Sequence, residues 1–385
     1  MASEIAGLVA NFGLQLYRSC QESGVSVVFS PLSIFIAMSM SYLGSCGETE
    51  AEMQQILYGG KLDKKRLLSY VADLMKSLHF EQENVVLRSA NRMYCSEGYS
   101  ILDSFNELLK KHFRSDMITL NFNDHNAASL VNSWILNQTG GKITGLLRPE
   151  VLSGSTKLLL VNALYFKGNW LQQFEAKNTS VENFYVDSQT TVKVSMMHRK
   201  GKFEYGERMD CQILSASYVG DFLKFFVILP KRKFALQEVE NKLTGEELVE
   251  MFYNVMEAEV DVKLPKFIIE KSMSLKDSLK QLGLNSMFSY DTANFSDISE
   301  AKGLFVSAVE HKTFIEINEE GSEAASATAV VMRFRCSPSS MNQELSFFAD
   351  HPFLFAVVDS RTMSMMFLGR YSGAGPSVSA SKIEL

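Results

Sequence analysis

The stretch from Glu319 to Cys336 constrains the fold of this chain more than any other. Its first half consists almost entirely of small residues, in the order Gly321-Ser322-Glu323-Ala324-Ala325-Ser326-Ala327. Small side chains pack weakly and give a segment little to anchor it, yet they fit into a narrow slot. The stretch therefore predicts a segment that is mobile in one state of the protein and inserted between other elements in another state.

The charges of this stretch fall on one face when it is read as a β-strand. Successive side chains of a strand point to opposite faces, so the period is two. The even positions from Ser322 to Phe334 carry no charge, whereas Glu323, Arg333 and Arg335 all occupy odd positions. Chance alone would sort three charges in this way about one time in four, but a loop that only has to be soluble gains nothing from such sorting. The pattern favours a latent strand with one buried face.

The stretch from Ser23 to Gly47 carries no charge, so both a membrane span and a buried core segment have to be weighed. About twenty apolar residues suffice to cross a bilayer. This stretch, however, contains seven serines and Pro31, and a broken run dotted with polar residues is costly in lipid but ordinary in a protein core. We therefore expect a buried strand followed by a buried helix, and no membrane partner.

The remaining pattern predicts a single domain of the α+β class. No long Pro/Gly/Ser run, repeat or charge block interrupts the chain before residue 370. The first 150 residues are mainly helical, and residues 1–20 look like the first helix of the mature fold rather than a leader. The windows with helical period are Glu50–Leu57, Lys64–Leu78, Asp103–Phe113, Gly245–Met251 and Ser274–Leu282. Strand windows dominate the later part and cover Leu158–Tyr165, Phe222–Leu229, Glu259–Leu264, Leu304–Ile317 and Met363–Leu368. Helices first and scattered strands afterwards are typical of antiparallel or mixed sheets rather than of βαβ units.

Composition and motif spacing argue against most enzyme classes. The net charge of -6 gives no reason to expect nucleic acid as a partner. No two histidines lie within four residues of each other and no Gly-x-Ser-x-Gly elbow is present, so we expect no metal, no cofactor and no hydrolase site. The cysteines are odd in number and far apart, which argues against a disulfide framework and favours a reducing compartment. They are Cys20, Cys46, Cys95, Cys211 and Cys336.

Two further features have both a plain and a functional interpretation. Lys61, Lys64, Lys65 and Arg66 form a basic cluster. A polyanion such as a glycosaminoglycan could bind there, but such runs are usually a solvated helix face, and that is what we expect. Cys336 could be imagined as a nucleophile, but no cysteine-protease signature surrounds it, and we expect an exposed loop cysteine.

Several motifs, taken in order along the chain, resemble the serpin family of serine-protease inhibitors. Residues 319–325 read Glu-Glu-Gly-Ser-Glu-Ala-Ala, which is close to the family's hinge motif Glu-Glu-Gly-Thr/Ser-Glu-Ala-Ala. The resemblance covers almost all of residues 1–371. Its other motifs are Phe29-Ser30-Pro31-Leu32-Ser33, Val161-Asn162-Ala163-Leu164-Tyr165-Phe166-Lys167-Gly168-Asn169-Trp170, Leu264-Pro265-Lys266-Phe267, His311-Lys312 and Asp350-His351-Pro352-Phe353-Leu354-Phe355. The chain resembles in particular the leaderless, ovalbumin-like serpins.

The resemblance implies a serpin fold with three β-sheets, about eight or nine helices and an exposed reactive-centre loop at about residues 319–342. It implies one domain over residues 1–371, followed by a flexible tail at 372–385, and a monomer. The hinge of the loop would consist of Glu319, Glu320, Gly321, Ser322, Glu323, Ala324, Ala325, Ser326 and Ala327.

By similarity, two polar sites would control entry of the loop into the central sheet. The shutter, a hydrogen-bonded cluster that separates and re-forms, would consist of Ser30, Ser33, Asn162 and His311. The breach, where the loop first enters, would contain Trp170, with Lys266 paired to Glu319. Taken alone, each of these residues fits equally well as a satisfied core polar group or a core tryptophan.

The family's spacing implies which bond a target protease would cleave. The scissile residue lies fourteen places after the hinge glycine, and counting from Gly321 reaches Arg335, so the bond would be Arg335-Cys336. A guanidinium pairs with an acidic specificity pocket, which implies a trypsin-like serine protease as partner, trapped in a covalent complex. Arg333 and Phe334 offer alternative cuts at a shifted register. Cys336 departs from the small hydroxyl residue common after this bond.

Two other functions remain open from the sequence. The first is a non-inhibitory chaperone or carrier with the same fold, against which the small-residue hinge argues. The second is an unrelated hydrolase, against which the missing catalytic motifs argue.

The expected location is the cytoplasm, with leaderless release to the outside as an addition that the sequence leaves open. The terminal residues Lys382-Ile383-Glu384-Leu385 resemble a retrieval signal of the endoplasmic reticulum. Such a signal acts only on a chain that has entered that compartment, so we read it as chance. The sequons at Asn137, Asn178 and Asn294 carry the same condition.

Overall fold

A computed structural model describes residues 2–20, 24–78, 80–82, 84–321 and 345–373 of this 385-residue chain. The predicted scissile bond Arg335-Cys336, the hinge residues from 322 onward and the predicted tail from 374 onward lie outside the described residues. The hinge is therefore described only at Glu319, Glu320 and Gly321. Ser372, at which the predicted flexible tail begins, is buried and donates its N–H to the Ser26 hydroxyl at 3.0 Å.

The strands that carry the predicted site residues Asn162 and His311 form a six-stranded mixed sheet with the order β11-β12-β5-β3-β2 and with β4 paired to β3. Its centre is β5, which runs parallel to β12 and antiparallel to β3. The strands are β2 (Phe80–Gln82), β3 (Val85–Ser96), β4 (Met117–Leu120), β5 (Leu158–Gly168), β11 (Phe267–Ser274) and β12 (Val306–Ile317). The two long parallel strands β5 and β12 meet along a seam, called the β5–β12 seam below.

The other strands form a nine-stranded sheet with the order β1-β15-β14-β9-β8-β7-β10-β13 and with β6 paired to β7. The strands are β1 (Val27–Phe29), β6 (Ser180–Tyr185), β7 (Thr191–Arg208), β8 (Cys211–Ser217), β9 (Leu223–Pro230), β10 (Met256–Pro265), β13 (Leu345–Phe348), β14 (Phe353–Asp359) and β15 (Ser364–Tyr371). The 18-residue β7 pairs with β6 through its first residues and with β8 through its last ones. Two of the three expected sheets are therefore joined by hydrogen bonds, because one long strand belongs to both.

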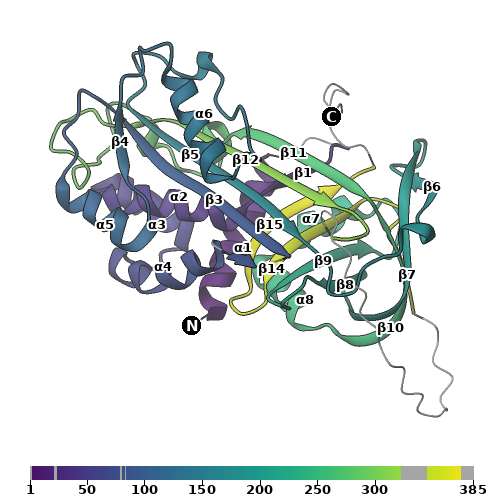
Figure 1. Ribbon diagram of the computed structural model, residues 1–385. Coiled ribbons are helices and arrows are strands. Elements are labelled where there is room, and N and C mark those ends of the chain that lie inside the picture. Colours follow the sequence, from purple (N-terminus) through teal and green to yellow (C-terminus); the bar gives the residue numbers. More distant parts are fainter. Residues whose placement is uncertain (1, 21–23, 79, 83, 322–344, 374–385) are drawn as a thin grey trace.

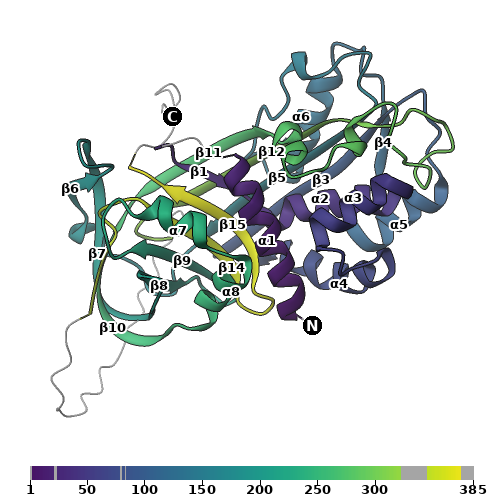
Figure 2. The ribbon, with the colours of Figure 1, turned by 180° about the vertical axis from the view of Figure 1, so that it is seen from behind.

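The predicted α+β class is confirmed, and the described residues contain nine α-helices. The helices are α1 (Ala2–Ser19), α2 (Pro31–Gly44), α3 (Gly47–Tyr58), α4 (Lys64–Leu78), α5 (Asp103–Phe113), α6 (Ala127–Gln138), α7 (Leu236–Lys242), α8 (Gly245–Tyr253) and α9 (Lys276–Gln281), with short 3₁₀ turns η1 (Pro149–Val151), η2 (Ala176–Asn178) and η3 (Ser286–Phe288). Figure 1 shows α6 over one face of the six-stranded sheet. The view from behind in Figure 2 shows α1, α7 and α8 beside the nine-stranded sheet.

Two hydrophobic cores lie on the two faces of the six-stranded sheet. The larger one contains the even positions of β5, among them Leu160 and Leu164, together with α2. The smaller one contains the odd positions Leu159 and Val161 and lies under α6, with Val131 and Ile135 of that helix. Because both faces of β5 are covered, this strand is apolar at almost every position, as is typical of a buried central strand.

The charge-free stretch forms a buried strand and a buried helix, as predicted. Every residue of β1 and of α2 is buried. Ser30 starts α2 as its N-cap, since its hydroxyl accepts a hydrogen bond from the Ser33 N–H, and Pro31 occupies the first turn where no donor is needed. In the described part of the chain, no helix combines the length and apolar character needed to span a bilayer.

Two long strands were missing from the expected elements, β3 and the 18-residue β7. β3 lies within the mainly helical first 150 residues and is twelve residues long. Both of its faces are largely covered, so its sequence lacks the simple alternation of apolar and polar residues that marks a half-buried strand.

Candidate functional site

The four residues predicted for the shutter lie together at the seam between β5 and β12. Asn162 of β5 is the register partner of His311 on β12 and of Asn91 on β3. Ser30 and Ser33 approach from the start of α2, below the same strands. All four predicted side chains are at most 1% exposed, so each polar atom needs a partner within the protein.

The hydrogen bonds of this cluster fix the proton position on His311. The Ser30 N–H donates to Nε2 of His311 over 3.1 Å, so Nε2 is an acceptor and carries no proton. Nδ1 must then carry the proton, and it donates to the side-chain oxygen of Asn162. Burial lowers the pKa of His311 to about 3, opposed only by the hydrogen bond with Asn162. The ring is therefore neutral at physiological pH, and the shutter holds no charge on it.

Asn162 connects the three central strands. Its amide nitrogen donates to the Ser33 hydroxyl and to the side-chain oxygen of Asn91, while its oxygen accepts from His311. Ser30 in turn accepts from the Ser33 N–H at 3.1 Å. Separation of β5 from β12 would break the bond between Asn162 and His311. Because the same Asn162 amide also binds Ser33 of α2, it connects both strands to that helix.

The sequence reasoning missed two members of this cluster, Ser89 and Asn91. The Asn91 amide donates to the Ser89 hydroxyl at 2.7 Å, and the Ser33 hydroxyl donates to Asn91 at 3.3 Å. A signal was present, because these two polar residues interrupt the odd positions of β3, where Val85, Leu87, Met93 and Cys95 are buried and apolar. Recognising it required the strand itself to be identified first.

Trp170 occupies the other end of the seam, just beyond β5. The indole is 2% exposed and stacks on Tyr218 at 4.4 Å between ring centroids. Its Nε1–H donates to the Asn318 carbonyl at 2.8 Å, and its backbone N–H donates to the Glu320 carbonyl at 2.8 Å. Trp170 thus ties the end of β5 to the chain that leaves β12.

Lys266 and Glu319 form an ion pair at this end, with 3.0 Å between Nζ and Oε2. The Thr179 hydroxyl donates to the other carboxylate oxygen at 2.9 Å. Partial burial alone would raise the pKa of Glu319, but hydrogen bonds from its own backbone, Lys266 and Thr179 outweigh burial, so the pKa lies below its usual value. Glu319 is therefore ionised at neutral pH, and this site is held by charge rather than by neutral hydrogen bonds.

Gly321 follows the pair in a conformation that only glycine adopts readily. Its φ is +109°, and a Cβ at this position would lie 2.2 Å from the Gly168 carbonyl oxygen and 2.5 Å from the Trp170 nitrogen. The close approach of two backbone segments therefore requires glycine. The described residues stop at Gly321 and resume at residue 345. Gly321 itself lies directly against the end of β5.

The regular pairing of β5 with β12 stops short of this end. The last register pair is Tyr165 with Phe314, three residues beyond the pair of Asn162 and His311.

On the α6 side, Lys312 donates to the Thr144 carbonyl at 2.8 Å and pairs with Glu270. Asn132 of α6 exchanges two hydrogen bonds of 2.9 Å with the backbone of Leu147. The segment after α6 is thereby fastened over the seam.

Two of the four residues of the basic cluster form local ion pairs. Lys64 lies 2.8 Å from Asp297, and Arg66 lies 3.2 Å from Glu4. These contacts favour the interpretation of a solvated helix face, in which acids already offset the charges of Lys64 and Arg66. Among the described residues, no group of three potential ligand side chains is arranged to hold a metal ion.

Comparison with known proteins gives a match along nearly the whole chain. Residues 8–373 match the family described as "Serpin (serine protease inhibitor)". Serpin B6 of Macaca fascicularis is 37% identical over 94% of this chain and 97% of its own length. Leukocyte elastase inhibitor of Homo sapiens is 34% identical over 96% of this chain and 99% of its own length.

Solved structures give a similar answer. The crystal structure of human thyroxine-binding globulin complexed with thyroxine superimposes with a TM-score of 0.85 at 25% identity, covering 97% of this chain and 99% of that one. The structure of Serpin48 from the insect Tenebrio molitor, described as highly specific, gives a TM-score of 0.83 at 28% identity, covering 97% and 98%. The same fold is thus found in proteins named for inhibition and in one named for binding a small molecule.

Proposed function

The chain belongs to the serpin family, and we propose that it inhibits a trypsin-like serine protease as a suicide substrate cleaved at Arg335-Cys336. The matching family is described as serine protease inhibitors, and one relative is named as an elastase inhibitor. The observation that carries the proposal is the position of Gly321, because the small-residue hinge starts at the end of the β5–β12 seam that it would have to enter.

The proposed reaction begins as ordinary proteolysis. The protease's serine oxygen attacks the carbonyl carbon of Arg335, and the bond to the Cys336 nitrogen breaks. That nitrogen takes up a proton from the protease's histidine and leaves as the new amino terminus, while Arg335 stays esterified to the serine. The bound protease is inactivated if the loop enters the sheet before water hydrolyses this ester.

Insertion of the loop would exchange one strand pairing for two. The contact between β5 and β12 is lost, and the loop then pairs with both strands as a new central strand. The shutter bonds of Asn162 have to break and re-form around it, whereas the uncharged even positions of the loop face a covered side of the sheet. The gain in strand hydrogen bonds and in burial of Val330 and Met332 would drive the change.

The first test is incubation with bovine trypsin. We expect a covalent species that survives boiling in detergent, and mass spectrometry of the products should locate the break between Arg335 and Cys336. Arg335→Ala should abolish most of the inhibition, because the guanidinium provides the bidentate contact with an acidic specificity pocket. Arg333→Ala is the matched control and should be much milder. Clean turnover of the wild-type protein without a covalent species would refute inhibition.

The second test addresses insertion itself. Ser322→Arg and Ala324→Glu place a charge on the even face that insertion would bury, which should slow insertion and convert the inhibitor into a substrate. Ala325→Glu is the control on the odd face and should be tolerated. The measured quantity is the number of moles of protein consumed per mole of trypsin inactivated. Equal values for all three variants would contradict the assignment of faces.

The main alternative is a non-inhibitory carrier or chaperone. Thyroxine-binding globulin shows that a protein of this fold can be named for a small-molecule ligand. The same trypsin experiment separates the two functions, since a carrier would be cleaved or ignored without trapping the protease. Thermal melting of the cleaved protein adds a second readout, because insertion should raise the melting temperature and a plain nick should not.

We further propose that the protein works as a monomer in the cytoplasm. Cys20, Cys46, Cys95 and Cys211 are all free. Burial raises the pKa of the Cys95 and Cys211 thiols to about 12, so neither is a ready thiolate. These features fit a reducing compartment. Cell fractionation and the glycosylation state of Asn178 would test the location, since glycan attachment requires the secretory pathway.

A further inference from the structure

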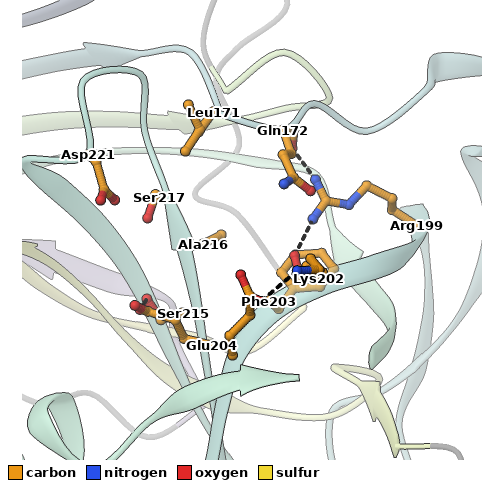
Figure 3. A pocket seen from close by; sticks show the side chains of 11 residues that line it. Leu171, Gln172, Arg199, Lys202, Phe203, Glu204, Ser215, Ala216, Ser217 and Asp221 are labelled. Carbon is orange, nitrogen blue, oxygen red and sulfur yellow. Dashed lines mark hydrogen bonds and ion pairs between the residues drawn. The ribbon is translucent and has the colours of Figure 1, made fainter. Parts of the chain in front are cut away.

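A polar cavity of about 190 Å³ lies next to the breach, between β7, the end of β8 and the chain segment 169–174. Figure 3 shows Arg199 and Phe203 of β7 on one side, Ser217 and Asp221 on the other, and Leu171 at the end near the breach. The volume is smaller than the roughly 300 Å³ at which cavities for drug-sized ligands begin. A ligand of this cavity would therefore be small.

Arg199 is the cation that the cavity presents. Its guanidinium lies 4.0 Å over the ring of Phe203 and 5.6 Å from that of Phe174. The terminal nitrogens donate to the backbone carbonyls of Gln172 and Lys202, and no carboxylate of the described residues forms an ion pair with them. Its Nε is buried and has no hydrogen-bond partner. The side chain is thus held in place by ring stacking and backbone carbonyls without a direct ion pair, although the charge of Glu259 acts on it.

The stacking explains how the arginine reaches this position. Arg199 and Phe203 are on the same face of β7, separated by Gly201. A Cβ on Gly201 would lie 3.9 Å from the Arg199 Nε, its nearest neighbour, so the long side chain runs over the glycine toward the ring. Burial lowers the pKa of Arg199 to about 10, opposed by the charge of Glu259, and the group stays protonated at neutral pH.

The other charges that line the cavity are offset or lie at its rim. Glu204 accepts from Lys224 at 2.5 Å and from the Ser215 hydroxyl at 2.7 Å. Lys202 forms an exposed pair with Glu257 at 2.7 Å. Asp221 is exposed on the opposite wall. These acids leave Arg199 as the anion-binding group and would repel a ligand with a second negative charge.

The apolar part of the wall lies between these groups. Leu171 is 55% exposed even though the chain on both sides of it is fixed by hydrogen bonds. We propose that the cavity binds a small organic anion with one negative group and an apolar body, the anionic group on Arg199 and the apolar body against Leu171, Phe203 and Ala216. Exposed apolar surface beside a stacked, unpaired guanidinium is the chemistry that recognises such a ligand.

The cavity is coupled by short backbone contacts to the hinge. Leu171 donates its N–H to the Ser217 carbonyl at 2.8 Å, while the preceding residue, Trp170, donates to the Glu320 carbonyl at 2.8 Å. Three residues further on, Phe174 donates to the Glu319 carbonyl at 2.9 Å. A ligand that immobilises this segment would stabilise the hinge as it stands and slow loop entry. The expected effect on loop entry rests on the proposed inhibitory function, whereas the proposed binding of the organic anion does not.

The binding test uses three probes of equal shape and different charge. They are 3-phenylpropionate, 3-phenylpropionamide and 3-phenylpropylamine, titrated into the full-length protein by calorimetry and by saturation-transfer NMR. The carboxylate should bind about tenfold more tightly than the amide, which corresponds to one charge-assisted hydrogen bond. The amine should bind least. Equal affinity for all three, or no binding of the carboxylate, would overturn the proposal.

Three variants locate the site. Arg199→Met keeps the contact with Phe203 but removes the charge, and should weaken phenylpropionate binding about tenfold. Leu171→Asp changes an exposed residue, leaves the core intact and should weaken binding as much through repulsion. Arg232→Met removes an exposed arginine elsewhere and should have no effect. Circular dichroism checks the fold of each variant. Unchanged binding of phenylpropionate to Leu171→Asp would refute this cavity as the binding site, even if Arg199→Met fails to fold.

The coupling test measures inhibition in the presence of the probe. Saturating 3-phenylpropionate should raise the number of moles of protein consumed per mole of trypsin inactivated, and should leave this ratio unchanged for Leu171→Asp. Binding of phenylpropionate without any change in the ratio would refute the coupling to the hinge but not the anion-binding site. If the protein does not inhibit trypsin at all, the binding experiment still tests the anion-binding site, so the two proposals can be refuted independently.

Discussion

The two ends of the β5–β12 seam are held together by different physics. At the shutter, Asn162 and His311 are buried, neutral and fully hydrogen-bonded to each other and to neighbouring strands and α2. At the breach, the buried Trp170 donates two hydrogen bonds to backbone carbonyls, one from its backbone and one from its indole, and beside it lies an ion pair whose lysine is 44% and whose carboxylate is 13% exposed. Buried polar groups cost a large free energy when they lose their partners, whereas exposed ion pairs can exchange theirs for water.

This difference predicts the direction in which the seam would open during the proposed loop insertion. The breach would open stepwise at small cost, since the regular pairing of β5 with β12 ends at Phe314. The buried hydrogen bonds of the shutter would cost more to break. We therefore expect opening to start at the hinge end, where the small-residue segment begins.

The largest effect is expected for Asn162→Ala. The substitution leaves the His311 Nδ1–H buried without a partner and leaves the Asn91 side-chain oxygen with only the 3.3 Å bond from the Ser33 hydroxyl, and it should cost about 3 kcal/mol of stability. Thermal and urea unfolding followed by circular dichroism measure the loss. Asn178→Ala is the control, since this exposed amide makes one weak bond of 3.4 Å. Equal losses for both variants would remove the distinction between the shutter and ordinary surface polar groups.

The second prediction uses the titration of His311. Because its folded pKa of about 3 lies below the ordinary value of 6.5, the unfolded chain takes up a proton in this window and the folded protein does not. His311 should thus destabilise the protein progressively as the pH falls from 6.5 toward 3, by at most about 1.4 kcal/mol per pH unit. The urea midpoint of the wild type and of His311→Gln should be compared between pH 7 and pH 4. A parallel pH dependence in both proteins would show that His311 does not carry the effect.

The third prediction concerns Gly321 at the breach. Gly321→Ala forces a Cβ against the Gly168 carbonyl and strains a positive φ, so the hinge turn should shift at a cost of about 1–2 kcal/mol. Hydrogen exchange of the Trp170 amide should accelerate because its bond to Glu320 loosens. Gly98→Ala is the matched control, since a Cβ there meets no atom within 4 Å. An unchanged exchange rate would mean that the hinge contact does not depend on this glycine.

The smallest effect is expected for Lys266→Met. The variant removes the ion pair with Glu319 but keeps most of the side-chain length, and should lower stability by only about 0.5 kcal/mol. High salt should reduce the difference further, which a melting series in sodium chloride would measure. Lys177→Met serves as the control for a fully exposed pair with Glu175. A loss as large as that of Asn162→Ala would contradict the contrast between the two ends.

The family, the α+β class and four of the residues at the seam could be inferred from the sequence alone. Motifs that occur in a fixed order along the chain identify a fold because each one satisfies a local requirement. Ser30 caps the start of α2, and Gly321 occupies a position with a positive φ and no room for a Cβ. The charge-free stretch was correctly assigned to the core for the same reason, since apolar residues with scattered serines suit a buried helix. These inferences depend on a few neighbouring residues, which a sequence displays directly.

The partners of each polar group could be identified only from the three-dimensional arrangement. Ser89 and Asn91 join the shutter because β3 pairs with β5 in one register, and a shift by one residue would point them to the other face. Two of the three sheets that the resemblance implied are joined through β7, and the cavity at Arg199 exists only because segments 169–174 and 199–204 meet. Long-range register and side-chain packing arise from many weak contacts between distant residues, so no local pattern in the sequence specifies them.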